Sequence, residues 1–150
     1  MAATDGISLR AILEECRDGK DGGAFNEVVV MLESTAASAE VWMDFDDLRF
    51  TPDGRIVTLM VPDGTHMHLD MSKIREAEFI HTTNDRALPS YQLWMRDGNG
   101  NPAMRVYLRK SDNDATNPPR HAFFMSLLEK YPGPIVLPAD AFGPAEGHPK

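Results

Sequence analysis

The middle of this chain alternates hydrophobic and polar residues in short runs, which is the period of a β-strand with one buried face. Between Ala39 and Phe45, for example, Val41, Met43 and Phe45 are expected to point to one side and the residues between them to the other. Alternating or β-branched runs of this length predict six to eight strands. The runs are Phe25–Glu33, Ala39–Phe45, Leu48–Phe50, Arg55–Val61, Thr65–Leu69, Ala77–Thr82, Tyr91–Arg96 and Met104–Lys110.

Strong turn signals separate several of these runs. Pro-Asp-Gly occurs at residues 52–54 and again at residues 62–64, and this tripeptide favours a tight turn. The Gly- and Asn-rich segment from Asp97 to Asn101 lies between two alternating runs, so it predicts a β-hairpin. We therefore expect an antiparallel meander with short loops.

Hydrophobic residues take a helical spacing near each end of the chain. Ser8 is a suitable N-cap for a first helix, whose apolar face is Leu9, Ile12, Leu13 and Cys16. Asn117 and Pro118 are suited to the cap and first position of a second helix, whose stripe is Phe124, Leu127, Leu128 and Tyr131. A single helical turn is expected at Met71–Ile74. The proline-rich tail from Pro134 is expected to form no regular element, with Ile135, Val136 and Leu137 able to dock it.

The order of helix, strands and helix predicts an α+β fold built on an antiparallel sheet. Because the strands alternate, the sheet is expected to have one wet or ligand-lined face. The chain of 150 residues fits one domain, here placed at residues 1–133, followed by a Pro/Gly-rich C-terminal tail at 134–150.

Charge and composition exclude several classes of function. The net charge of -8 is spread along the chain, which argues against nucleic acid because phosphate contacts need clustered lysine and arginine. No apolar run approaches the roughly 18 residues of a membrane span, and the N-terminus lacks the features of a signal peptide. We expect a cytoplasmic protein. The single cysteine, Cys16, has no internal disulfide partner and is expected to be a packed thiol.

Three histidines are candidates for ligand chemistry. His66 and His68 are two residues apart on a predicted strand, so both side chains project from one face and can bind a metal. His81 lies on another strand and can converge with them. A cupin-like metal site needs a glutamate four or five residues after the second histidine, where this chain has Ser72 and Lys73. The alternative is that these are ordinary histidines on half-exposed strands.

The predicted hairpin offers a second candidate surface. Its outward positions combine Trp94, Arg96, Arg105, Tyr107 and Arg109. Aromatic rings beside guanidinium groups suit a flat ligand that carries carboxylates. The alternative is a solvated outer face held by cross-strand pairs. No nucleophile elbow or phosphate-binding loop occurs, so no catalytic residue is assigned.

The order of three segments resembles a known family. It is similar to that of the haem-utilisation proteins of the HemS and ChuX/HutX type. The three segments are HLDMSKIREAEFI, YQLWMRDGNGNPAMRVYLRK and a helix with FFMSLLEKY. The matching residues are His68, Leu69 and Ile74 on the first strand, and Asp97, Gly100, Met104, Val106, Tyr107, Leu108 and Arg109 on the hairpin. The likeness covers roughly residues 26 to 131. The segment VWMDFDDLRF has no histidine where many family members carry one.

The resemblance implies an α+β fold with large antiparallel sheets, a homodimer, and a bacterial cytoplasmic role in holding, moving or degrading haem. It implies that His68 is the axial ligand of the haem iron and that Arg105 and Arg109 meet the propionates. The residues expected to bind haem are His68, His66, His81, Tyr107, Arg105, Arg109 and Trp94. A carrier or chaperone of haem is the function we expect. The alternative is an interaction or regulatory module of the same fold without haem and without catalysis.

Overall fold

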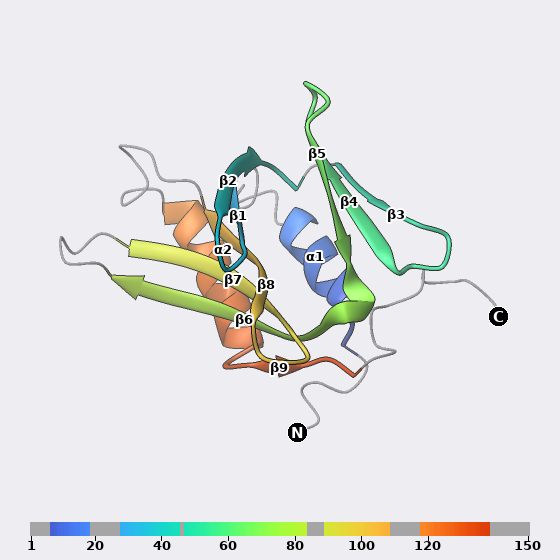
Figure 1. Cartoon of the computed structure of the whole chain (residues 1–150). Coiled ribbons are helices and arrows are strands. Elements are labelled where there is room, and N and C mark those ends of the chain that lie inside the picture. Colours follow the sequence, from blue (N-terminus) through green and yellow to red (C-terminus); the bar gives the residue numbers. More distant parts are fainter. Residues whose placement is uncertain (1–6, 19–27, 46, 84–88, 109–117, 139–150) are drawn as a thin grey trace.

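The computed structural model describes residues 7–18, 28–45, 47–83, 89–108 and 118–138 (Figure 1). Two helices, a short 3-10 helix and nine strands lie in these ranges. In chain order they are α1 (Leu9–Asp18), β1 (Val28–Glu33), β2 (Ser38–Met43), β3 (Asp47–Phe50), β4 (Ile56–Met60), β5 (His66–Asp70), η2 (Met71–Lys73), β6 (Ile74–Thr83), β7 (Pro89–Asp97), β8 (Pro102–Leu108), α2 (Pro118–Lys130) and β9 (Ile135–Val136).

The strands form two antiparallel sheets. The large sheet has the order β2-β1-β8-β7-β6-β9, and the small sheet has the order β3-β4-β5. Within each sheet most consecutive strands pair as expected for a meander, but β8 also returns to pair with β1, where Val30 is opposite Val106. The predicted α+β class with antiparallel sheets is confirmed, and the single meander is divided into two sheets.

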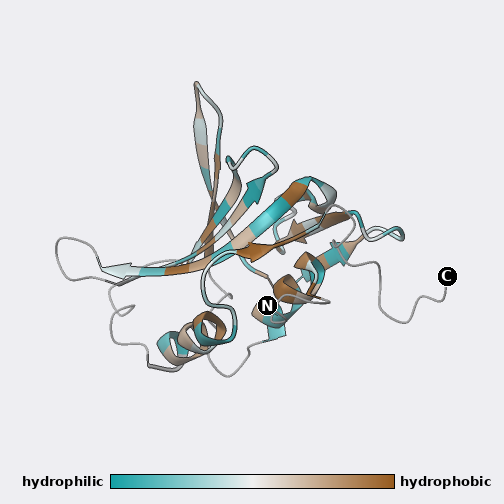
Figure 2. Ribbon diagram, turned by 90° about the horizontal axis from the view of Figure 1, so that it is seen from below, coloured by the Kyte–Doolittle hydropathy of each residue, from teal (hydrophilic) through white to brown (hydrophobic). Residues whose placement is uncertain are grey.

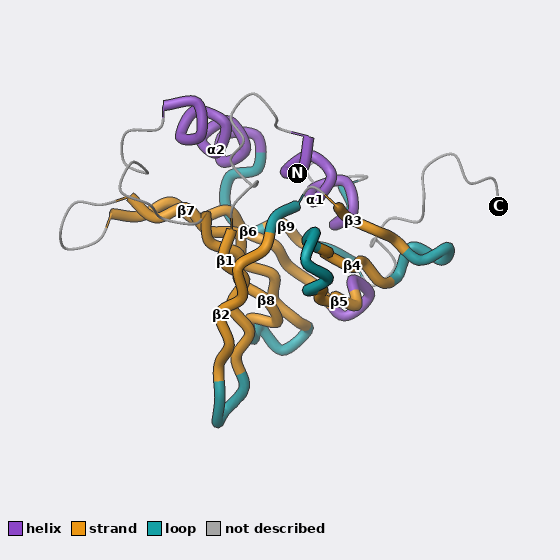
Figure 3. Tube along the Cα trace, turned by 90° about the horizontal axis from the view of Figure 1, so that it is seen from above, coloured by secondary structure: helices purple, strands orange, loops and turns teal. Residues whose placement is uncertain are grey.

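Both helices lie on the same side of the sheets, as the views from opposite directions in Figures 2 and 3 show. The hydrophobic core fills the space between the helices and the sheets. The predicted apolar face of α1 is buried, with Leu9, Ile12, Leu13 and Cys16 at most 1% exposed. Phe79 of β6 packs against Phe124 and Tyr131 of α2 at ring-centroid distances of 5.7 and 5.9 Å. Burial of each such side chain stabilises the fold by roughly 1.5–3 kcal/mol.

The start of α1 is the one predicted. The hydroxyl of Ser8 accepts a hydrogen bond from the backbone N–H of Ala11 at 3.1 Å, which satisfies one of the free donors at the helix start. Further along α1, the Glu15 carboxylate accepts a hydrogen bond from the Tyr131 hydroxyl at 2.6 Å, which joins α1 to the residue that follows α2. The predicted cap of α2, Asn117, lies outside the described residues.

The prediction that the tail forms no regular element is wrong for Ile135 and Val136. These two residues form β9, which pairs with Glu76 and Ala77 at the edge of the large sheet. Ile135 and Leu137 are each 2% exposed, so the predicted docking is confirmed for these two, whereas Val136 is 63% exposed and points outward. The physical reason is that an unpaired edge of β6 offers backbone hydrogen bonds, and the two apolar side chains fill the core beneath it.

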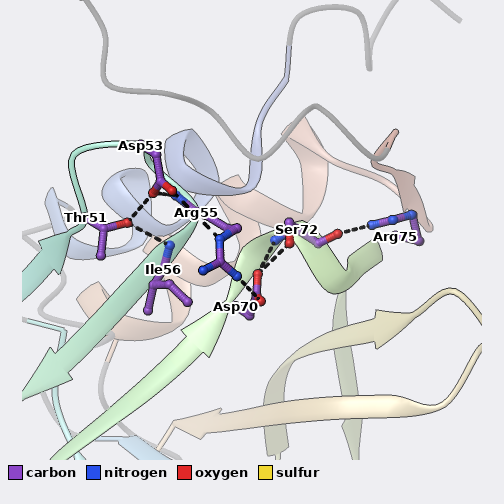
Figure 4. A network of polar contacts seen from close by, with 7 residues as sticks. All are labelled: Thr51, Asp53, Arg55, Ile56, Asp70, Ser72 and Arg75. Carbon is purple, nitrogen blue, oxygen red and sulfur yellow. Dashed lines mark hydrogen bonds and ion pairs between the residues drawn. The ribbon is translucent and has the colours of Figure 1, made fainter.

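A network of polar contacts holds the corner where the chain passes from the small sheet to the large one (Figure 4). The Arg55 guanidinium donates to the Asp70 carboxylate at 2.6 Å. The same carboxylate accepts from the backbone N–H and hydroxyl of Ser72, and Arg75 donates to the Ser72 carbonyl. This corner fixes the direction of β5, which carries two of the candidate histidines.

Within the described ranges, neither helix has the length and apolar character that a bilayer crossing requires.

Candidate functional site

The histidine pair of β5 lies on the outer face of the small sheet. Burial alternates along the strand, so His66 and His68 are exposed while Met67 and Leu69 are buried. The two imidazole rings have centroids 5.2 Å apart. The prediction that both side chains share one face is confirmed.

Each imidazole of this pair is held through its Nδ1 atom. The Nδ1 of His66 lies 3.0 Å from the Gly64 carbonyl oxygen, which can only accept, so the ring carries its proton on Nδ1. The Nδ1 of His68 lies 2.8 Å from the hydroxyl of Thr58 on the neighbouring strand. The Nε2 atoms make no hydrogen bond within the described part of the chain. The Nε2 of His66 is therefore available as a ligand to a metal ion or to haem iron, and that of His68 is available when Thr58 accepts the hydrogen bond from Nδ1.

A shallow pocket lies beside this face. Its volume is about 250 Å³, and it is lined by Asp44, Asp47, Arg49, Met60, Val61, Pro62 and Gly64. Met60 is opposite both Asp47 and His66 in the sheet register, so the pocket adjoins the first histidine. Asp47 and Arg49 form an ion pair across its edge at 2.9 Å. Binding pockets for drug-sized ligands have volumes of about 300–1,000 Å³, so a tetrapyrrole would extend beyond this hollow.

The aromatic and arginine residues of the hairpin gather on the outer face of the large sheet, as predicted. Trp94 is opposite Arg105, and Gln92 is opposite Tyr107. The guanidinium carbon of Arg105 lies 4.9 Å from the Trp94 ring centroid, and that of Arg96 lies 5.1 Å from it. Such cation–π contacts fix the orientation of the indole ring.

Carboxylates of neighbouring strands already pair with these guanidinium groups. Arg105 forms an ion pair with Glu33, and Arg96 pairs with Glu78 at 3.0 Å and also with Glu76. A propionate would have to compete with these carboxylates. Arg109, the second arginine expected to meet a propionate, lies outside the described residues.

The third candidate histidine joins a different cluster. His81 of β6 stacks on Tyr91 of β7 with ring centroids 4.8 Å apart. It also makes an edge contact at 5.8 Å with His121 of α2. No ring contact joins His81 to His66 or His68 among the described residues. His81 and the β5 pair therefore belong to separate sites.

Comparison by sequence identifies no relatives, because no family model and no curated protein matches the chain. Comparison by structure does. The haem-binding protein ChuX has a TM-score of 0.65 and 9% identity, over 83% of this chain and 72% of that one. This chain has the ChuX-type fold. The fold implied by the family resemblance is thereby confirmed.

Two larger proteins contain the ChuX-type fold as part of their length. ChuS, an E. coli haem oxygenase, has a TM-score of 0.60 and 17% identity over 85% of this chain and 35% of ChuS. PhuS, a haem-binding protein from Pseudomonas aeruginosa, has a TM-score of 0.58 and 9% identity over 80% of this chain and 33% of PhuS. This chain therefore corresponds to about a third of each of these proteins.

Within the ChuX-type fold, the predicted residues form three groups and not one. His66 and His68 lie on the small sheet, Trp94, Arg105 and Tyr107 lie on the large sheet, and His81 lies beneath α2. No hydrogen bond, ion pair or ring contact links these groups within the described ranges. The described ranges do not include any group of three or more His, Cys, Asp or Glu side chains that could hold a metal ion.

His121 is a further candidate residue that was not predicted from the sequence. A signal was available, because His121 precedes Phe124 by three residues and Leu128 by seven. This spacing places the histidine on the same face of the helix as the apolar stripe. The face points to the sheet, where the Tyr91 hydroxyl lies 2.7 Å from the His121 Nδ1.

Proposed function

We propose that this chain binds haem and serves as a carrier or chaperone in haem utilisation. The observation that carries the proposal is the ChuX-type fold, which is shared with the haem-binding proteins ChuX and PhuS. Function is not implied by fold alone, so the proposal also requires a ligand for iron. The exposed histidine pair on β5 supplies one.

His68 is the residue we propose as axial ligand. Its Nδ1 is held by Thr58, which orients the ring, and its Nε2 is directed away from that bond. A hydrogen bond to the second ring nitrogen is the usual support of a metal-bound imidazole. His66 lies beside it on the same face and is expected to contact the porphyrin.

An open sheet face suits transfer of haem more than permanent retention. Haem is a flat apolar molecule, and an exposed imidazole on a sheet covers only one side of it. The other side stays accessible to a receiving protein. This arrangement favours a carrier over an enzyme.

Hemin titration of the purified apo protein tests the proposal. We expect a saturable shift of the Soret band at a defined stoichiometry. H68A should weaken the affinity at least about tenfold, H66A should weaken it less, and H121A is a matched control on another element that should leave it unchanged. A spectrum that stays that of free hemin would refute haem binding. If H81A or H121A removes the shift while H68A keeps it, haem binding stands and the ligand assignment is wrong.

A second candidate function is a non-haem interaction module that acts as a homodimer. The observation that favours it is the outer face of the large sheet, where the arginines are already neutralised by glutamates. Trp42 of β2, on the same sheet, is 65% exposed. A neutral aromatic face of this kind is typical of a protein–protein interface. A second copy of this chain is the partner we propose for it.

The oligomeric state measured by light scattering after gel filtration tests this candidate. We expect a dimer without haem and a shift toward monomer in W42E. A122E is the control, because Ala122 is also exposed but lies on α2, on the opposite side of the large sheet. A monomer at all concentrations, or equal dissociation by both variants, would reject the interface.

A further inference from the structure

A second pair of histidines meets on the helix-covered side of the large sheet. His81 of β6 is half-buried, and His121 of α2 lies above it with ring centroids 5.8 Å apart and an interplanar angle of 74°. Tyr91 lies between the strand and the helix, and it is 7% exposed. The three residues come from three elements that only the fold brings together (Figure 1).

The tautomer of His81 follows from its hydrogen bond. Its Nδ1 lies 3.1 Å from the backbone carbonyl oxygen of Ser90. Because a carbonyl can only accept, Nδ1 carries the proton and the neutral ring has its lone pair on Nε2. This is the arrangement found in metal-binding histidines, where a carbonyl or carboxylate orients the ring through its other nitrogen.

His121 is oriented in the same way by Tyr91. The Tyr91 hydroxyl and the His121 Nδ1 share a hydrogen bond of 2.7 Å. When the phenol oxygen accepts this bond, the lone pair of His121 also lies on Nε2. Neither Nε2 has a hydrogen-bond partner in the described part of the chain. In that tautomer both imidazoles are held by one nitrogen and available for coordination through the other.

The ring spacing fits a shared ion. With metal–nitrogen bonds of about 2 Å, two imidazoles on one ion have centroids about 5 to 6 Å apart, depending on the angle at the metal. We propose that His81 and His121 bind one divalent transition-metal ion, with water completing its coordination. This site is independent of the haem site on β5.

The donor set determines the class of ion. Two neutral imidazole nitrogens suit Zn²⁺, Cu²⁺ and Ni²⁺, whereas Mg²⁺ and Ca²⁺ prefer oxygen ligands. An ion at this position links α2 to β6, since one ligand comes from each. It should therefore stabilise the folded state, because the unfolded chain does not hold these two residues together.

The His66 and His68 pair provides a matched internal control. Its ring spacing of 5.2 Å is similar, and both of its Nδ1 atoms are also engaged. However, its two residues are neighbours on one exposed strand, so the unfolded chain retains most of their chelating ability. Metal binding there adds little to the free energy of unfolding, because ligands that bind both states do not shift the equilibrium.

Zinc titration of the tag-free apo protein, followed by calorimetry and thermal melting, tests the site. We expect Zn²⁺ to raise the Tm of the wild type while Mg²⁺ does not. H121A, whose side chain is exposed, should fold normally, lose the Tm increase and weaken zinc binding at least about tenfold. The double variant H66A/H68A should keep the Tm increase.

Tyr91→Phe is a second test of the metal site, because it removes the hydroxyl that orients His121 and keeps the ring that packs on His81. We expect weaker zinc binding with nearly unchanged stability in the absence of zinc. The proposal is overturned if H121A retains the zinc-dependent Tm increase of the wild type, or if H66A/H68A abolishes it.

Discussion

Asp70 shows how one carboxylate positions a candidate site. It accepts hydrogen bonds from Arg55 and from two donors of Ser72 at the corner between the sheets. Partial burial raises the pKa of this carboxyl, but the hydrogen bonds from Ser72 and the charge of Arg55 outweigh that effect, and the pKa is lowered. The ionised form is therefore the one that the folded state favours.

Asp70→Asn should lower the free energy of unfolding by about 1–2 kcal/mol at neutral pH, because it removes charge-assisted hydrogen bonds. Since the folded pKa is depressed, the stabilisation is complete above the ordinary carboxyl pKa of about 3.9 and is lost as the pH falls through the folded value. Urea unfolding of both proteins across this pH range measures the difference, which should shrink in acid. Asp63→Asn, which affects only a local turn contact to Thr65, is the control with a smaller effect.

The thiol of Cys16 should be unreactive in the folded protein. Cys16 is 1% exposed, and burial, followed by the nearby Glu15 charge, raises its pKa well above the usual value. Because the thiolate is the reactive form, a thiol reagent at mildly alkaline pH should label the protein only after urea is added. Labelling of the native protein at the rate of a free thiol would contradict this packing.

At the scale of elements, the two sheets have different supports. In the large sheet, the short strand β9 covers the edge of β6. The backbone N–H of Leu137, the residue after β9, donates a hydrogen bond to the Arg75 carbonyl at 2.8 Å. The small sheet depends on the corner network and on the buried side of β4, where Val57 is 0% and Leu59 is 2% exposed. The histidines of β5 therefore lie on an element that is packed on one side only.

Two adjacent residues of β9 separate packing from strand formation. Ile135→Ala should destabilise the fold by about 2–4 kcal/mol, because it leaves a cavity at a side chain that is 2% exposed. Val136→Ala, on the exposed side of the same strand, should change stability by less than about 0.5 kcal/mol. Equal losses in urea denaturation would show that β9 contributes through its backbone pairing and not through its core contact.

At the scale of the whole molecule, charge opposes a haem ligand. The net charge is -8, haem carries two propionates, and Arg96 and Arg105 of the large sheet are paired with glutamates. Long-range repulsion of this kind is screened as the Debye length falls from about 30 Å at low salt to about 8 Å at physiological salt.

The association rate of hemin with the apo protein should therefore rise with ionic strength. Stopped-flow measurement of the Soret change at several salt concentrations tests this prediction, with a neutral porphyrin ester as control. A rate that falls with salt would instead indicate that Arg105 attracts the propionates during encounter. That result would support the role for Arg105 which the family resemblance implies.

Local patterns in the chain were sufficient to predict most elements. The stripe of Leu9, Ile12, Leu13 and Cys16 specifies a buried helix face, because helical spacing depends only on neighbouring residues. Alternation in β7 and β8 likewise separates the buried Leu93 from the outward Trp94. The placement of His66 and His68 on one face follows from the same period of two, and the structure shows that this face is exposed.

The sequence by itself thus determined the α+β class, the helix faces, the hairpin and the shared face of the β5 histidines, since each depends on short-range periodicity. Only the tertiary structure decided that β8 pairs with β1, that the strands divide into two sheets, and that Arg105 meets Glu33. It alone brought His121 to His81 and Tyr91. These contacts join residues far apart in the chain, and their register is selected by packing of the whole core and not by any local pattern.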